Sequence, residues 1–195
     1  MTFRQVRGEA GPRGESGRRE LGRRELGRRE SVCPGCRSRL PFASELSYTG
    51  YYHCSPACWT VYTEVLGFEF TDVVAFAQSH QLTVDTYAVQ HAGGHHKPKS
   101  VAVHLVGLYA ALELRRPPRS IPGLLQAVAA AHKTWPTFEL PRHTGPLTVV
   151  EVALAPNTLE HIHRVRKWAE FVWKAWQAYH DEVARLAAPA VDFAN

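Results

Sequence analysis

Apolar side chains recur at helical spacing from residue 56 onward. Trp59, Tyr62 and Val65 lie three residues apart, which places them on one face of a helix. The preceding Ser55-Pro56 pair supplies an N-cap and a first helical residue. The pattern therefore predicts a helix from Pro56 to about Phe70.

The next stretch predicts two shorter helices. Thr71-Asp72 can cap a helix that runs to about Ser79, and Thr83 can cap another that ends at Gly93-Gly94. Beyond it, Ser100 is expected to cap an apolar helix. The further predicted helices are Val101–Leu114, a helix of about ten residues from Pro122, and a long helix from Thr158 to about Ala187.

Three segments carry other signals. Trp135 to Pro146 contains three prolines and is expected to be a loop. Thr148 to Glu151 fits both a capping box and a β-rich segment, and Tyr48 to His53 suits a short hairpin. The predicted fold class is mainly α, with a small module at the head of a helical bundle.

All four cysteines lie in two close pairs, Cys33-Pro34-Gly35-Cys36 and Cys54-Ser55-Pro56-Ala57-Cys58. Two pairs with this internal spacing can surround one tetrahedral zinc ion, in a site closed to water and substrate. Disulfides or a redox Cys-x-x-Cys are the alternative, although redox chemistry would leave the second pair unexplained. We expect Zn²⁺ to be bound by Cys33, Cys36, Cys54 and Cys58.

A second group of residues that commonly bind metals lies further along the sequence: His80, Asp85, His91 and His104. His91 and His104 flank the Gly93-Gly94 turn between two predicted antiparallel helices, so their side chains can meet. An open histidine site there could hold a catalytic metal, as in a hydrolase-like enzyme. The alternative is that these are buried polar residues that lock a helix hairpin.

Charge is concentrated at the N-terminus. Residues 1–30 hold nine arginines and five glutamates, a net charge of +4 out of +5 for the whole chain. These residues have few apolar side chains, so we expect a disordered tail. Any contact with nucleic acid is expected through this tail alone, because the remainder is nearly neutral. No signal peptide or membrane span is expected, which predicts a soluble, cytoplasmic protein.

The long C-terminal helix is rich in tryptophan. Trp173 and Trp176 share a face and Trp168 lies to one side, and we expect core packing against the earlier helices. A surface that binds a protein partner is the alternative. His161 and His163, near the start of the same helix, are expected to face solvent.

The stretch Tyr51-Tyr52-His53-Cys54-Ser55-Pro56-Ala57-Cys58-Trp59 resembles the second half of the TRASH and YHS group of treble-clef zinc fingers. In that group an aromatic strand leads into a cysteine pair at the head of a helix. The resemblance covers residues 33–59 and implies a metal-binding module, some members being proposed metal sensors. It implies no catalytic residues.

A wider resemblance covers residues 31–182. The segments that carry it are Cys33-Pro34-Gly35-Cys36, Ser55-Pro56-Ala57-Cys58-Trp59, the block His80–His91, Val103-His104-Leu105 and the tryptophan-rich 166–176. Together they are similar to one uncharacterised bacterial domain family of unknown function. In that family's pattern the Cys54 position is often a small residue, which implies three thiolates and one other ligand. His80 is then a candidate for the fourth ligand.

These expectations divide the chain into a tail (1–30), a zinc-binding module (31–60), a helical domain (61–187) and a short C-terminal tail (188–195). The leading hypothesis is a non-catalytic binding or regulatory protein with a structural zinc site. Zinc would then replace the core that a module of 30 residues cannot supply. The alternatives are a metal-dependent enzyme and a nucleic-acid-binding protein.

Overall fold

The computed structural model describes residues 30–41, 48 and 50–191. These residues confirm the mainly α fold class. The elements in chain order are β1 (Glu30–Val32), β2 (Arg39–Pro41), α1 (Pro56–Thr71), α2 (Val73–Gln90), α3 (Pro98–Leu112), η2 (Pro118–Ser120), α4 (Ile121–Ala131), α5 (Val149–Ala153), α6 (Thr158–Ala175), η3 (Gln177–Tyr179) and α7 (His180–Val191).

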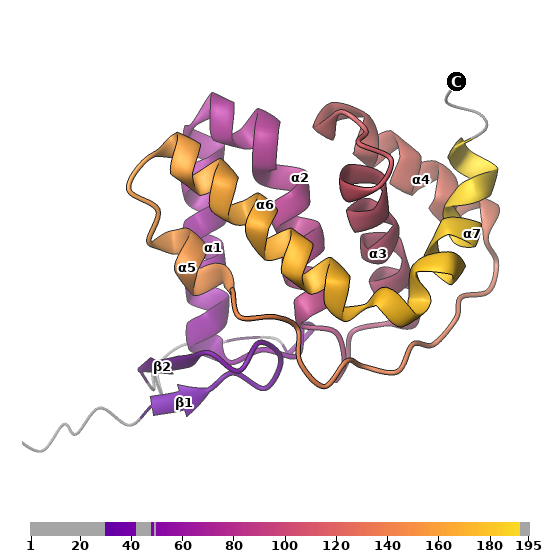
Figure 1. The fold of residues 1–195 in the computed structure, drawn as a ribbon. Coiled ribbons are helices and arrows are strands. Elements are labelled where there is room, and N and C mark those ends of the chain that lie inside the picture. The colour runs from indigo at the N-terminus through magenta and orange to yellow at the C-terminus, as the bar shows by residue number, and fades with distance from the viewer. Residues whose placement is uncertain (1–29, 42–47, 49, 192–195) are drawn as a thin grey trace, which may run out of the picture.

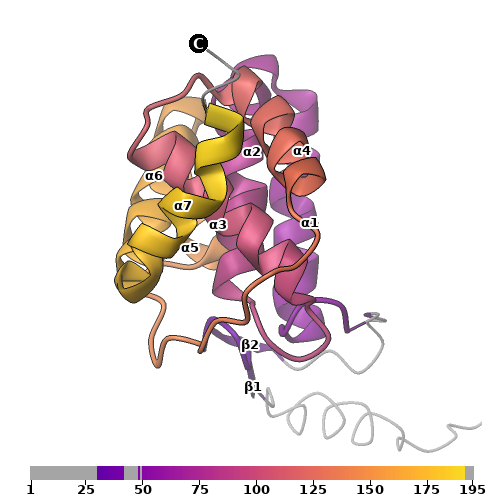
Figure 2. The same ribbon diagram turned by 90° about the vertical axis from the view of Figure 1, so that its right-hand side faces the viewer.

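Helix α2 is the centre of the molecule (Figure 1). It packs against α1, α3 and α6, and α1 in turn packs against α5. On the other side α3, α4 and α7 contact one another and form a second helical layer (Figure 2). A small antiparallel β-sheet lies at the N-terminal end of α1 (Figure 1).

The sheet is a hairpin whose turn carries the first cysteine pair. Strands β1 and β2 pair with Ser31 opposite Leu40 and Val32 opposite Arg39. The second predicted hairpin, at Tyr48 to His53, is not a strand in residues 50–53, which form bends, while Thr49 lies outside the described residues.

Side-chain caps explain where most helices begin. Ser55 accepts the Cys58 N–H at the start of α1, and Asn157 accepts the Glu160 N–H at the start of α6. Thr148 and Glu151 complete a capping box, so the segment that also looked β-rich is helical. The helix predicted from Pro122 and the loop predicted over 135–146 are both present.

The two short helices predicted between residues 72 and 91 are one helix. Asp72 caps α2 as predicted, accepting from the Val74 and Ala75 N–H groups at 3.0 Å each. Thr83 is not a cap, because its hydroxyl donates to buried Glu69 at 2.6 Å from within the continuous helix. Ser100, likewise, lies inside α3, and its hydroxyl contacts His96 Nε2 at 2.9 Å.

The long helix predicted from Thr158 to Ala187 is broken at Trp176. The His180 ring stacks on Trp173, with centroids 3.7 Å apart, and its Nε2 lies 3.0 Å from the Trp173 carbonyl oxygen. This contact supplies a partner at the end of α6 and turns α7 toward α3 and α4. Helix α7 extends to Val191, into the range predicted as a C-terminal tail.

The predicted core role of the tryptophans is confirmed. Trp168 and Trp176 are at most 1% exposed, and Trp173 is 5% exposed. The expectation that His161 faces solvent is wrong, because it is buried beneath α1 and α2. No described helix is both long and apolar enough to span a lipid bilayer. The predicted arginine-rich tail lies, up to residue 29, outside the described residues.

Candidate metal centre

The turn between β1 and β2 presents two sulfurs to one point. The Cys33 N–H donates to the Ser38 carbonyl at 2.8 Å, and the Arg37 N–H donates to the Cys33 carbonyl at 3.0 Å. Arg37 takes a left-handed conformation with φ of 66°, which closes the tight turn. We call residues 33–37 the knuckle; it holds Cys33 and Cys36 on the same side.

Two helix ends supply the remaining groups. Cys58 lies in the first turn of α1, where its N–H is bonded to the Ser55 cap. His91 is the C-cap of α2. Its Nδ1 lies 2.8 Å from the Tyr87 carbonyl oxygen, which selects the tautomer with the proton on Nδ1 and leaves Nε2 free as a ligand.

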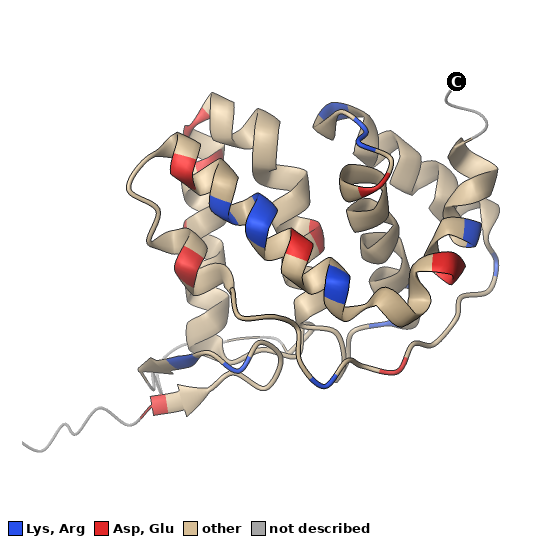
Figure 3. Cartoon of the chain, viewed as in Figure 1, with Lys and Arg blue, Asp and Glu red and all other residues tan. Residues whose placement is uncertain are grey.

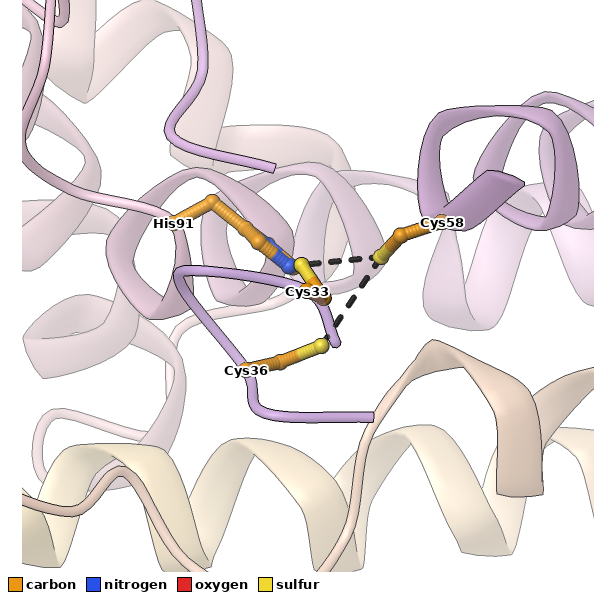
Figure 4. Close-up of side chains that lie close together, drawn as sticks. All are labelled: Cys33, Cys36, Cys58 and His91. Atoms are coloured by element: carbon orange, nitrogen blue, oxygen red, sulfur yellow. Dashed lines mark hydrogen bonds between the residues drawn. The ribbon is translucent and has the colours of Figure 1, made fainter. Parts of the chain in front are cut away.

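These four side chains converge (Figure 4). The ligand atoms of Cys33, Cys36, Cys58 and His91 all lie within 4.8 Å of one another. Cys58 Sγ is 3.4 Å from His91 Nε2 and 3.8 Å from Cys36 Sγ. All four residues are buried, Cys33, Cys58 and His91 completely. Within the described ranges, no other group of three or more such residues meets this criterion.

Gly35 allows the knuckle to approach the end of α2. A Cβ at this position would lie 2.6 Å from His91 Cδ2 and 2.5 Å from the His53 carbonyl oxygen. The His53 N–H also donates to the His91 carbonyl at 2.9 Å. Gly35 therefore lets the knuckle lie against His91 and the His53 backbone, and no larger residue fits at position 35 without displacing this contact.

The sulfurs lie so close together that ionising several of them at once is unfavourable unless a cation balances their charge. Hydrogen bonds from Cys36 and Cys58 hold the pKa of Cys33 far below its usual range, and hydrogen bonds to Cys33 and Cys36 hold that of Cys58 far above. Burial lowers the pKa of His91, but its contacts with the Cys33 and Cys36 sulfurs outweigh this and raise the pKa to about 9. A divalent cation would neutralise the thiolates and displace the protons.

Cys54 lies outside the group of four. It is buried, but it precedes the Ser55 cap, and its N–H donates to the Tyr52 carbonyl at 2.8 Å. Burial raises the pKa of its thiol, and its sulfur is not among the atoms that lie within 4.8 Å of one another. The sequence predicts Cys54, or His80 in its place, as the fourth metal ligand. In the structure the residue that lies beside the other three cysteines is His91.

The other predicted site residues are distributed over two separate pairs. His104 Nδ1 lies 2.8 Å from Asp85 Oδ1, and Gln81 Nε2 donates to both oxygens of the same carboxylate at 3.0 Å. His80 Nδ1 lies 2.9 Å from Glu69 Oε2. Because α2 is continuous, His80 and His91 are separated by about 16 Å of helix, so the four residues do not form one site.

Sequence reasoning missed the buried carboxylate of Glu69. Glu69 Oε1 accepts from the hydroxyls of Ser79 and Thr83 and lies 2.8 Å from His161 Nε2. Together with His80 these contacts join α1, α2 and α6. The one available signal was a glutamate at a position where the α1 stripe is otherwise apolar.

The site can hold one metal ion in a closed shell. Three sulfurs and one imidazole nitrogen are a tetrahedral donor set that zinc takes in structural sites. The donors come from the knuckle and from two helix ends that are far apart in the sequence. An ion bound here would tie the sheet to both α1 and α2.

The chain matches the model of a family of unknown function, DUF5946, over residues 31–177, and it belongs to this family. The matched region begins in the hairpin and ends just beyond α6, so it contains all four converging residues. No curated protein and no solved structure matches the chain.

Proposed function

We propose that this protein binds one Zn²⁺ through Cys33, Cys36, Cys58 and His91, and that the ion is structural. The observation that carries the proposal is the convergence of four buried donor atoms within 4.8 Å of one another. Three thiolates favour zinc over harder divalent cations such as Mg²⁺ and Ca²⁺. Burial of all four donors, with Cys36 at most 6% exposed, leaves no open position for water or substrate.

The arrangement supports a treble-clef-like module whose fourth ligand comes from outside the module. A knuckle and the first turn of a helix supply the three cysteines, as in the family of fingers that the cysteine segment resembles. The fourth ligand comes from the end of α2, which belongs to the helical bundle. The proposed zinc therefore fastens the module to the bundle, and the protein acts as a non-catalytic binding or regulatory protein.

Metal analysis of the purified full chain tests this assignment. We expect one zinc per chain, and less than a tenth of this in Cys58→Ser and in His91→Ala. Cys54→Ser is the matched control, because it replaces a buried thiol beside the same helix start and should keep the metal. His91→Cys should restore binding, since it returns a soft ligand to the fourth position.

Cobalt substitution gives an independent measurement. Co²⁺ in a tetrahedral site with three thiolates should show strong visible absorption and sulfur-to-metal charge transfer, which Cys54→Ser should leave unchanged. Zinc retained by His91→Ala but lost from Cys54→Ser would show a four-cysteine site instead. A second metal lost from His104→Ala would support the metal-dependent enzyme and contradict the proposal.

A further inference from the structure

A cavity of about 250 Å³ lies on the outer side of the knuckle. Its walls are the knuckle itself, the loop 140–144 and the C-terminal end of α2, and Trp176 also lines it. It is distinct from the metal centre, whose converging sulfurs are not among its lining residues. The volume is slightly below the range of ordinary small-molecule pockets, so it suits a small ligand.

The ionisable residues that line this cavity are all basic types. They are Arg37, His53, Arg142 and His143, with no aspartate or glutamate among the lining residues. Figure 3 shows basic positions on the knuckle turn and on the loop before α5, at the same edge of the molecule. Neither arginine side chain pairs with a carboxylate anywhere in the described part of the chain. Two unpaired guanidinium groups at one cavity favour an anion.

Trp176, a buried residue whose indole N–H lacks an acceptor within the described residues, also lines the cavity. This residue is 1% exposed. Gln90, which also lines the cavity, is engaged elsewhere: its Oε1 accepts from Trp168 at 2.9 Å and its amide donates to the Leu147 carbonyl. A buried N–H without an acceptor is unfavourable, and a ligand oxygen that reached it would remove this cost.

Part of the remaining wall is apolar. Val89, Ala92, Leu140 and Pro141 line the cavity beside the cationic groups. Such a surface does not compete for the anionic group and suits the carbon skeleton of a small organic molecule. The lining of the cavity therefore combines two arginines, a tryptophan whose indole N–H lacks an acceptor among the described residues, and a partly apolar wall.

We propose that this cavity binds a small oxyanion, the phosphate or carboxylate group of a small metabolite. Arg37 and Arg142 supply charge-assisted hydrogen bonds to its oxygens, and the Trp176 indole N–H donates to an oxygen that enters the cavity. Arg37 is positioned by its N–H bond to Cys33, so ligand affinity depends on the proposed zinc site. Loss of the metal would release the knuckle and with it one of the two arginines.

The indole signal of Trp176 provides a direct test. The chain has five tryptophans, so ¹⁵N-labelled zinc-loaded protein should show five indole N–H signals, and Trp176→Phe identifies one of them. Inorganic phosphate and, separately, acetate are titrated at constant ionic strength. We expect the Trp176 signal to shift with a Kd of the order of 1 mM for at least one of the two anions.

Variants separate this site from general attraction of anions. Arg37→Gln/Arg142→Gln should weaken binding at least tenfold, because it removes the charge-assisted hydrogen bonds to the anion. Arg119→Gln is the matched control: this exposed arginine lines a different cavity, beside His80, and its loss should leave the Kd unchanged. A shift with phosphate alone identifies a phosphoryl ligand, and a shift with acetate includes carboxylates.

Two results would overturn the oxyanion site: no movement of the Trp176 signal with either anion, or equal movement in the double arginine variant. Zinc content is measured on every sample. An absent shift in fully zinc-loaded protein contradicts the oxyanion site alone. Absence of zinc from the wild-type chain contradicts the proposed function, whatever the anion titration shows.

Discussion

Helices α2 and α3 approach each other closely at Gly107. A Cβ on this residue of α3 would lie 2.2 Å from Asp85 Oδ2 on α2, closer than any two unbonded heavy atoms of this kind can lie. Asp85 is fully buried and is held there by His104 and Gln81. The glycine therefore makes room for a buried polar pair, despite its unfavourable helix propensity.

At the residue scale, Gly107→Ala should lower the free energy of unfolding by about 2 kcal/mol or more, because the added methyl group displaces a buried carboxylate. Gly67→Ala is the control. It also lies inside a helix, but nothing lies within 4 Å of its added Cβ, so it should stabilise by up to about 1 kcal/mol. Urea denaturation of both variants measures the difference. Equal effects of the two substitutions would refute the packing argument.

At the scale of the helices, the packing of α1, α2 and α6 depends on one buried carboxylate. Glu69 on α1 is completely buried and meets partners on the other two helices. An uncompensated charge here would be costly, whereas two imidazoles and two hydroxyls satisfy its oxygens. Thr158 of α6 adds a contact between the same helices, because its hydroxyl donates to Asp72, the residue between α1 and α2.

Glu69→Ala should therefore lower the free energy of unfolding by about 3–5 kcal/mol, since it leaves several buried polar groups without a partner. Glu64→Ala removes an exposed carboxylate from the same helix and should change stability by no more than about 0.5 kcal/mol. Chemical denaturation followed by circular dichroism compares the two. A loss below about 1 kcal/mol in Glu69→Ala would show that the network does not hold the helices together.

At the scale of the whole molecule, the candidate metal centre lies at one end of a buried core that continues through the helical bundle. The core around Leu105, Val128 and Trp168 lies among α2, α3, α4, α6 and α7 and needs no metal to exclude water. The β1–β2 hairpin is short, its turn carries two of the proposed metal ligands, and it contacts the bundle through β2 on α1 and Ser38 on Thr148. Metal loss should therefore release the hairpin before the bundle melts.

Removal of the metal with a strong chelator should lower the thermal midpoint by about 10 °C or more, since several kcal/mol of binding energy are lost. Most far-UV circular dichroism should remain. Hydrogen exchange should become fast at the Cys33 N–H, while the amides of α3 and α6 stay protected. Uniform loss of protection over all helices would show that the ion supports the entire fold, and addition of Zn²⁺ should reverse the change.

Local physics explains which parts of this architecture the sequence could predict. Ser55, Asp72 and the Thr148 capping box act on their own neighbours, so the helix starts at 56, 73 and 149 follow from the residues beside them. The error at Thr83 has the same origin. A threonine within an amphipathic stretch looks like a cap until a partner on another helix, Glu69, is known to accept its hydroxyl.

The sequence by itself determined the mainly helical class and the two cysteine pairs, because periodicity, caps and tight spacing are properties of neighbouring residues. Only the tertiary structure decided that His91 joins Cys33, Cys36 and Cys58, while Cys54 lies apart and His80 and His104 meet carboxylates. Spacing cannot show this, because Cys58 and His91 belong to different helices. They meet only because α1 and α2 pack side by side and Gly35 lets the knuckle close over the end of α2.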